Sequence, residues 1–469
     1  MSKVKKVLAA VIAAAMAGTL ALGATGCQKV DEQQSAASGA TASGTQGKIS
    51  GDLDVAVFKG GYGDQIWKDV AAKFQEKYPD VKVNITANAD IGSVLRPQIT
   101  KGDVPDFIYL ASTNKSGLLQ ALIADKQLAD ISDVFDSELK GRLLDGALSG
   151  PTITPYGDGK IYSAPLFYSV MGPWYDANLF EKNSWEVPKT WDEAYALADK
   201  AKEKGIGLLT YAAANAPTYN ESLVWPLIAT AGTQEDLQNI FDYKEGAWTS
   251  QAVTDALGVY QKIHDKGYLM EGTLGMNHTQ SQQEWMQDKA LFIPNGAWMQ
   301  GEMKDVQPTE GFEFAMAATP AIKEGQQQCL WAASEEMYIP AKAKNIDAAK
   351  AFMKFLYEED TIQMMAKTTN AVPPIKGAAD FVKDAVDEAT YNSLKMADSG
   401  EYTLVSGGFA NTQQTNITIK DDFFNGLNDI MSGKTTAADL QKKLEGESKE
   451  LAKIKLAAGE TAEAASAAE

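Results

Sequence analysis

Short strand-like segments alternate with amphipathic helical segments along most of the chain. Residues 53–58 alternate apolar and polar side chains, and a helical pattern follows that starts at Asp64, an expected N-cap, and stops at Pro79. The other strand-like segments are 81–85, 106–111, 206–211 and 290–294. Strands separated by helices are typical of α/β proteins with largely parallel sheets. The sequence therefore predicts an α/β fold.

Two later helices carry clear local signals. Thr190-Trp-Asp-Glu193 is a capping box, and Gly205 is the expected stop of the helix that it opens. Residues 347–358 place Phe352 and Phe355 on one apolar stripe, which predicts a second helix. In α/β sheets, ligands bind in the loops that follow the carboxyl ends of the strands. These loops are where binding residues are expected.

The first 27 residues have the pattern of an export signal. A short basic start is followed by an apolar run over 7–24 and by Thr25-Gly26-Cys27. This ending resembles the lipobox of bacterial lipoproteins, although Ala24 stands where that pattern prefers Leu. The resemblance implies cleavage after Gly26 and a diacylglycerol lipid, with palmitate-type acyl chains, on the Cys27 thiol. An uncleaved anchor, or an ordinary signal with an incidental Cys, remains the alternative.

Both ends of the exported chain lack the pattern of a folded core. Residues 27–49 are rich in Ser, Ala, Gly, Thr and Gln, which predicts a flexible tether, and the Ala/Glu-rich segment 455–469 predicts a disordered tail. The chain has 469 residues, and the part between these two segments is long enough for two or three domains. We expect a protein on the extracellular face of the membrane of a Gram-positive bacterium.

The charge balance narrows the class of ligand. The chain has 43 basic and 62 acidic residues and a net charge of −19, which argues against nucleic-acid binding. Arg96 and Arg142 are the only arginines in the sequence, so a site for phosphate, sulfate or carboxylate is disfavoured and a neutral ligand is favoured. With two His and two Cys, no metal site is expected, and we expect no cofactor.

Aromatic residues at strand ends and in Gly-, Pro- or Asn-rich loops are the most specific chemical signal. Aromatic ring faces stack on sugar rings, and amide or carboxylate oxygens accept hydrogen bonds from sugar hydroxyls. The Gly-rich segment 59–63 lacks either nucleotide fingerprint, and the common catalytic motifs are absent from the sequence. Trp67, Trp191 and Trp285 lie in helical patterns and are expected in the core, whereas Trp225 could be core or site.

Several motifs in order resemble one known family. They are Gly102-Asp-Val-Pro-Asp-Phe-Ile-Tyr109, Gly159-Lys-Ile-Tyr-Ser-Ala-Pro165, Trp174-Tyr-Asp-Ala-Asn-Leu-Phe180, Pro188-Lys-Thr-Trp-Asp-Glu193, Trp225-Pro-Leu-Ile-Ala229 and Ala290-Leu-Phe-Ile-Pro-Asn-Gly-Ala-Trp298. Over roughly 50–450 the chain resembles the extracellular solute-binding proteins (family 1) of carbohydrate ABC importers, which include the maltose-binding protein. The segments 60–63 and 91–97 look most similar to the branch that binds N-acetylglucosamine and chitobiose.

The resemblance implies a two-domain periplasmic-binding-protein-like fold with a hinge that the chain crosses about three times. We expect the crossings near 164, 330 and 378. The implied parts are a signal peptide (1–26), the tether (27–49), an N-terminal lobe (50–163 and 331–378), a C-terminal lobe (164–330 and 379–454) and the tail (455–469). Closure of the lobes on a sugar would precede docking on an ABC permease, and the protein is expected to be a monomer without catalytic activity.

The resemblance also implies a set of sugar-binding residues. They are Tyr62, Asp64, Ser112, Asn114, Tyr168, Asn220, Glu221, Trp298, Trp331 and Phe409. Two other classes remain open at this point. An exported glycan-degrading enzyme would also have an aromatic-lined cleft. A receptor for peptides or amino acids would need charged partners, and the two arginines disfavour it.

Overall fold

The computed structural model describes residues 48–111, 114, 116–413 and 415–455. The predicted signal peptide, Cys27, Ser112 and nearly all of the predicted tether and tail lie outside these residues. No helix within the described ranges has the length and the apolar composition needed to cross a membrane. The body of the chain begins at Ile49.

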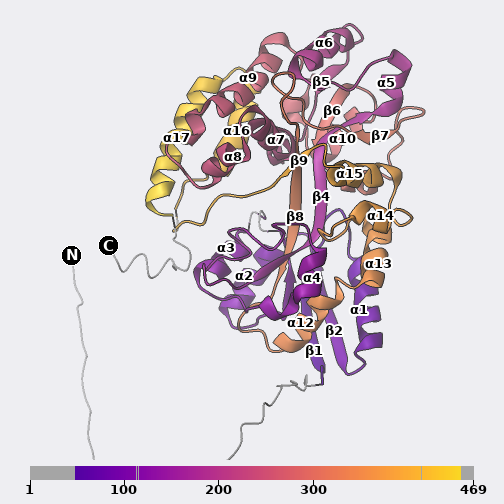
Figure 1. The fold of residues 1–469 in the computed structure, drawn as a ribbon, viewed down its shortest axis with the longest axis vertical. Coiled ribbons are helices and arrows are strands. Elements are labelled where there is room, and N and C mark those ends of the chain that lie inside the picture. Colours follow the sequence, from indigo (N-terminus) through magenta and orange to yellow (C-terminus); the bar gives the residue numbers. More distant parts are fainter. Residues whose placement is uncertain (1–47, 112–113, 115, 414, 456–469) are drawn as a thin grey trace, which may run out of the picture. The chain divides into compact units, whose positions relative to one another are not determined.

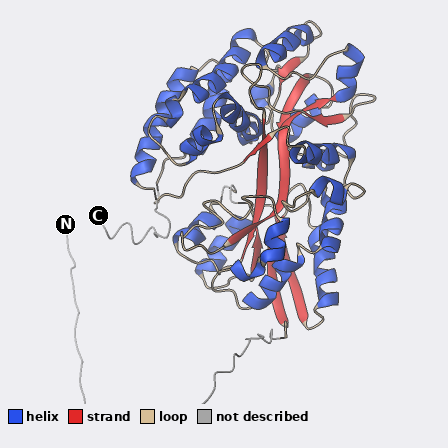
Figure 2. Cartoon of the chain, in the orientation of Figure 1, coloured by secondary structure: helices blue, strands red, loops and turns tan. Residues whose placement is uncertain are grey.

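Nine strands form one mixed sheet in the described part of the chain, in the order β2-β1-β3-β8-β4-β6-β5, with β7 paired to β4 and β9 paired to β8. The strands are β1 Gly51–Phe58, β2 Val81–Asn88, β3 Phe107–Tyr109, β4 Ser163–Asp176, β5 Gly207–Leu209, β6 Ala290–Asn295, β7 Phe314–Met316, β8 Cys329–Tyr338 and β9 Thr403–Val405. Helices cover the sheet, so the predicted α/β class is confirmed (Figure 2).

The expectation of a largely parallel sheet is wrong. β1 is parallel to β2 and β3, and two further pairs, β5 with β6 and β8 with β9, are also parallel. The pairs β3–β8, β4–β6, β4–β7 and β4–β8 are antiparallel. The reason is that two long central strands, β4 and β8, run in opposite directions through the sheet.

The helices of the described residues begin largely where local signals place them. They are α1 Gln65–Lys77, α2 Ile91–Thr100, α3 Leu118–Ala124, α4 Ser137–Arg142, α5 Ala177–Asn183, α6 Trp191–Lys202, α7 Glu221–Ala231, α8 Gln234–Phe241, α9 Gln251–Lys266, α10 His278–Trp285, α11 Trp298–Glu302, α12 Ile346–Phe355, α13 Glu359–Thr369, α14 Ala378–Val382, α15 Glu388–Asp398, α16 Ile419–Met431 and α17 Ala437–Lys453. The predicted capping box of α6 is present, with reciprocal hydrogen bonds between Thr190 and Glu193.

The central strands connect two groups of elements. β4 pairs with β8 from Ser163 to Met171, and β4 then continues to pair with β6 and β7 from Gly172 to Asp176. β1, β2 and β3 therefore lie toward one end of the β4–β8 pair, and β5, β6 and β7 lie toward the other (Figure 1). Because β4 belongs to both groups, its middle is where side chains from the two groups can meet.

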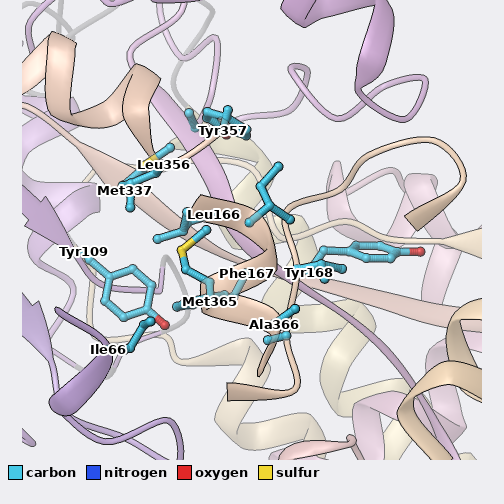
Figure 3. Close-up of a cluster of buried hydrophobic side chains, with 14 of the residues drawn as sticks. Ile66, Tyr109, Leu166, Phe167, Tyr168, Met337, Leu356, Tyr357, Met365 and Ala366 are labelled. Carbon is cyan, nitrogen blue, oxygen red and sulfur yellow. The ribbon is translucent and has the colours of Figure 1, made fainter. Parts of the chain in front are cut away.

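The two faces of β4 contact different parts of the protein. Phe167 and Ser169 point to one face and Tyr168 to the other, because successive side chains in a strand alternate. Figure 3 shows Tyr109 and Tyr168 well apart, with Leu166 and Phe167 between them. On the Phe167 face, Trp67 of α1 packs 4.8 Å from Tyr109 and 6.4 Å from Phe167, measured between ring centroids. Helix α1 therefore covers this face near β3.

Farther along the same face, Met171 of β4 pairs with Trp331 of β8, and both belong to a second apolar cluster that includes Trp225 of α7. Helix α7 packs against β8 there. Between the parts covered by α1 and by α7, Ser169 and residues 332–335 are half-buried. Of these, Ser169, Ala333 and Glu335 point to this face, because Ser169 pairs with Ala333 and Phe167 pairs with Glu335, and we call these three residues the central strand floor.

Candidate functional site

Tyr62 borders the central strand floor from the side of β1. It lies in the loop between β1 and α1, its ring centroid is 4.8 Å from that of Phe167, and its Oη lies 3.4 Å from Oγ of Ser169. Burial, and next the nearby carboxylate of Glu335, raise the pKa of Tyr62 well above its usual value. Its hydroxyl therefore stays protonated at physiological pH and can donate a hydrogen bond.

Two aromatic side chains lie near the start of α7, and one of them, Tyr219, is close enough to Tyr62 to raise the pKa of its hydroxyl. Tyr219 lies in the short 3₁₀ segment Pro217–Asn220, directly before α7, and Trp298 begins α11. Their ring centroids are 6.2 Å apart, and Tyr219 stacks on the imidazole of His278 with centroids 4.7 Å apart. Both Tyr219 and Trp298 are half-buried. A partly exposed aromatic pair of this kind provides a flat apolar surface with polar edges.

A polar group adjoins this aromatic pair. Oε2 of Glu302 lies 2.6 Å from Nε2 of His278 and accepts a hydrogen bond from Nε2 of Gln282 at 3.0 Å. A methyl group built on Gly61 would lie 3.0 Å from Oε1 of Glu302, which is tighter than ordinary contact. The loop that contains Tyr62 therefore lies close to the Glu302 side chain of α11, and a side chain at position 61 would crowd that contact.

Glu335 is the central acidic residue of the floor, and the sequence reasoning missed it. It lies on β8 directly opposite Phe167, and its Oε2 is shielded from solvent without a hydrogen-bond partner in the described residues. Burial, and secondarily the neighbouring Glu336, raise the pKa of Glu335 to about 8. The two adjacent acidic residues Glu335 and Glu336 in a mostly apolar strand were the signal that could have indicated it.

Several predicted site residues lie away from the floor or have partners of their own. Asn220 is fully buried, donates from Nδ2 to the carbonyl of Pro217 at 3.3 Å and accepts from the Tyr260 hydroxyl at 3.2 Å. Glu221 forms an ion pair with Lys420 at 3.4 Å. Both side chains therefore have contacts within the protein, and their contact with a sugar stays a prediction.

Phe409 and Trp331 also pack within apolar surroundings. The ring of Phe409 lies 5.4 Å from that of Phe241 and 5.8 Å from that of Tyr243. Trp331 is 4% exposed, and its indole N–H has no hydrogen-bond partner among the described residues. Trp331 points to the same face as Glu335, because four residues separate them along β8.

The remaining predicted residues are spread around the floor. Asp64 bridges Lys59 at 3.2 Å and Lys68 at 3.0 Å, and these two lysines hold the pKa of its carboxyl below the usual value. Asn114 accepts a hydrogen bond from the backbone N–H of Ser116. Tyr168 lies on the opposite face of β4 from Tyr62, where its backbone N–H bonds the carbonyl of Val372. Which of the predicted residues contact a ligand stays a prediction.

The fold and this arrangement define a class of protein. Two groups of α/β elements share a pair of long strands, and aromatic and polar side chains from both groups meet over the middle of that pair. This is the architecture of a two-domain binding protein. The chain belongs to the bacterial extracellular solute-binding protein family, whose model matches residues 60–363.

Curated relatives and solved structures agree with this assignment. The chain is 26% identical over 400 residues to a diacetylchitobiose binding protein of Streptomyces coelicolor, with 83% of each chain covered. It is 24% identical over 332 residues to a maltooligosaccharide ABC transporter solute-binding lipoprotein of Streptococcus pneumoniae, covering 69% of this chain and 73% of the relative. The structure of apo RafE from Streptococcus pneumoniae matches with a TM-score of 0.68 at 19% identity, covering 87% of this chain and 100% of RafE.

Proposed function

We propose that this protein is the substrate-binding protein of an ABC importer, and that it captures an extracellular neutral sugar or oligosaccharide and delivers it to the transporter permease. Membership of the solute-binding family and similarity to relatives named for sugar binding support this function. The protein acts by binding and release and has no catalytic activity of its own.

The observation that carries the proposal is the aromatic and polar border of the central strand floor. Tyr62 approaches from one side, and Tyr219 and Trp298 approach from the other. Aromatic faces can stack on the C–H face of a sugar ring, while Ser169 and Glu335 offer hydrogen-bonding groups between them. The scarcity of arginine in the whole sequence favours an uncharged ligand.

We propose an N-acetylglucosamine or chitobiose unit as the sugar. Similarity to the diacetylchitobiose binding protein of Streptomyces coelicolor supports this choice over maltooligosaccharides, because that relative is more similar over a larger share of the chain. We further propose that residues 50–163 and 331–378 form one lobe and residues 164–330 and 379–454 the other, and that they close on the sugar. The packing of α15 against β7 and β4 supports placing the segment after 378 in the second lobe.

We also propose that the mature protein begins at a lipidated Cys27 and acts as a monomer at the extracellular face of a Gram-positive cell membrane. Lipidation of Cys27 can be tested by metabolic labelling of cells with a radioactive fatty acid. The wild-type protein should carry label and partition into detergent, whereas Cys27→Ser should be unlabelled and soluble. An unlabelled wild-type protein would exclude the lipid anchor.

The function is tested by calorimetric titration of the mature chain (residues 27–469 with Cys27→Ser) against N-acetylglucosamine, diacetylchitobiose, maltose and raffinose. One sugar class should bind, and Trp298→Ala should weaken that binding at least tenfold, because the stacking surface is lost. Trp185→Ala is the matched control, since Trp185 is also a half-buried tryptophan but lies against Phe180, with ring centroids 6.0 Å apart. If no sugar binds, the carbohydrate function is wrong.

A separate assay addresses the enzyme alternative. The purified chain is incubated with chito- and maltooligosaccharides, and the products are separated by chromatography. A binding protein leaves the oligosaccharides intact at any protein concentration. Turnover that is retained after repeated purification would instead identify an exported glycan-degrading enzyme.

A further inference from the structure

Two buried polar groups on one face of the sheet lack hydrogen-bond partners among the described residues. Oε2 of Glu335 and Oη of Tyr109 are both shielded from solvent and unpartnered. Tyr109 pairs with Met337 across β3 and β8, and Glu335 lies two residues from Met337, so the side chains of Tyr109 and Glu335 share a face. An unmet buried polar group costs free energy, and two on one face suggest that something else satisfies one of them.

The surroundings of Glu335 contain no positive partner within the described chain. β4 contributes Phe167, directly opposite, and Ser169, two residues farther along on the same face. The loop before α1 contributes the Tyr62 hydroxyl, and β3 contributes Tyr109. Of the other titratable groups, Glu336 follows in the strand, and Glu302 and Tyr219 lie beyond Tyr62, where Glu302 contacts His278. Within the described residues no Lys, Arg or His forms an ion pair with Glu335, and the His278 imidazole pairs with Glu302.

As a whole residue, Glu335 is nevertheless only partly buried. Residues 332–335 are half-buried, in contrast to the buried residues on either side of them in β8. Glu335 therefore lies in the part of β8 between the segments that α1 and α7 cover, near the Tyr62 side chain that the proposed function assigns to the sugar. A ligand on the floor would lie next to Glu335.

We propose that Glu335 binds the sugar as a neutral carboxylic acid, donating a hydrogen bond to an uncharged oxygen of the ligand, and that ionisation of Glu335 releases the sugar. This inference rests on the proposed function. A protonated carboxyl offers one O–H donor and keeps an acceptor oxygen, whereas the ionised form only accepts. The pKa of about 8 means that the donor form predominates at neutral pH in the free protein.

A sugar on the floor would further favour the protonated form of Glu335. It removes water from a carboxyl that already lacks a cation, and burying an unpaired charge costs far more than burying a hydrogen-bonded neutral group. Binding above the pKa therefore requires proton uptake. The apparent dissociation constant equals the intrinsic one divided by the fraction of protein with protonated Glu335, so it rises as the pH passes the pKa.

The test is calorimetric titration of the mature chain (Cys27→Ser) with diacetylchitobiose and with cellobiose, which lacks the acetamido groups. Affinity should fall about tenfold between about pH 7 and about pH 9, because roughly a tenth of Glu335 is then protonated. Titration at the higher pH in buffers of different ionisation enthalpy should reveal uptake of about one proton. If only diacetylchitobiose loses affinity, the acceptor is an acetamido oxygen; if both sugars do, it is a hydroxyl.

Two variants separate the role of the proton from that of the side chain. Glu335→Gln keeps a donor and an acceptor without a titratable proton, so it should bind nearly as well at neutral pH and show no pH dependence or proton uptake. Glu335→Ala should bind weakly at both values of pH. Glu271→Gln, at an exposed position, is the control and should keep the wild-type pH profile. Thermal unfolding checks that each variant is folded.

The outcomes are distinct. If sugars bind but wild type and Glu335→Gln share one pH profile, the inference is wrong and the sugar-binding function stands. It is also wrong if the Glu335 carboxyl, followed by NMR in the free protein, titrates near its usual value. If no sugar binds at any pH, the proposed function fails and this inference fails with it.

Discussion

Oε2 of Glu302 lies 2.6 Å from Nε2 of His278 and also accepts the amide of Gln282, so a single carboxylate oxygen joins α10 to α11 beside Tyr219. Gln282 is fully buried, whereas about a quarter of the side-chain surface of Glu302 remains exposed. This group holds the imidazole on which Tyr219 stacks. The position of the aromatic border therefore depends on a polar contact that lies behind it.

Glu302→Ala should destabilise the protein by about 1–3 kcal/mol, because the buried Gln282 amide and the His278 imidazole lose their shared acceptor. Urea unfolding of the mature chain measures the change. Glu310→Ala is the matched control, since the Glu310 side chain is exposed, and it should stay within about 0.5 kcal/mol of wild type. Equal stability of the two variants would show that the Glu302 contacts contribute nothing.

Asn220→Ala should also lower the free energy of unfolding, by about 1–3 kcal/mol, because it leaves the fully buried Tyr260 hydroxyl without its acceptor. Tyr260→Phe removes the same hydrogen bond from the other side. The double variant should therefore cost less than the sum of the two single changes, as measured by urea unfolding. If Asn220 instead contacts the sugar, calorimetry will show an affinity loss in Asn220→Ala that Tyr260→Phe does not share.

Local sequence signals predicted the elements that depend on few residues. The capping box at Thr190 and Glu193 opens α6 as expected, and α1 begins directly after Asp64. Asp64 occupies the predicted N-cap position, but its side chain does not cap the helix. The carboxylate bridges Lys59 and Lys68 and makes no capping hydrogen bond. Lysines before the helix and in its first turn compete for the carboxylate, and a rule based on residue spacing does not include that competition.

The long central strands were not predicted from the sequence. The central strand floor, which consists of residues of these two strands, was therefore not predicted either. β4 contains Pro165, Gly172 and Pro173, which locally indicate a loop, yet its partner β8 lies more than 150 residues away along the chain. Only that long-range pairing makes the segment a strand, and only the pairing places Glu335 opposite Phe167. The aromatic residues in loops indicated Tyr62 and Trp298 as candidate site residues. That Tyr168 lies on the opposite face of the sheet from Tyr62 follows only from the alternation of side chains along β4.

Trp225 is the residue that the sequence left between core and site, and the structure places it in the core. It is 2% exposed and stacks on Phe423 with ring centroids 4.8 Å apart. Trp225→Ala should therefore cost about 3–5 kcal/mol of stability through the cavity that it leaves. Trp185→Ala, at a half-buried position, should cost clearly less in the same denaturation experiment. A smaller loss for Trp225 than for Trp185 would contradict the core assignment.

Asp288 should make the stability of the protein depend on pH near neutrality. Burial and the nearby Asp176 carboxylate raise the pKa of Asp288 from 3.8 to about 6, and its Oδ1 has no hydrogen-bond partner among the described residues. The folded state therefore binds the Asp288 proton more tightly than the unfolded state does. The stabilisation is complete below the unfolded pKa and is lost as the pH rises through the folded value.

Asp288→Asn removes this titration and leaves a neutral side chain beside Asp176. Its stability relative to wild type should rise between about pH 4 and about pH 7 and then level off, because the wild-type carboxyl is ionised above that range. Urea unfolding across this pH range measures the difference. Asp305→Asn, at an exposed position, is the matched control and should give a constant difference from wild type. An equally flat difference for Asp288→Asn would mean that the Asp288 carboxyl titrates at its ordinary pKa in the folded protein.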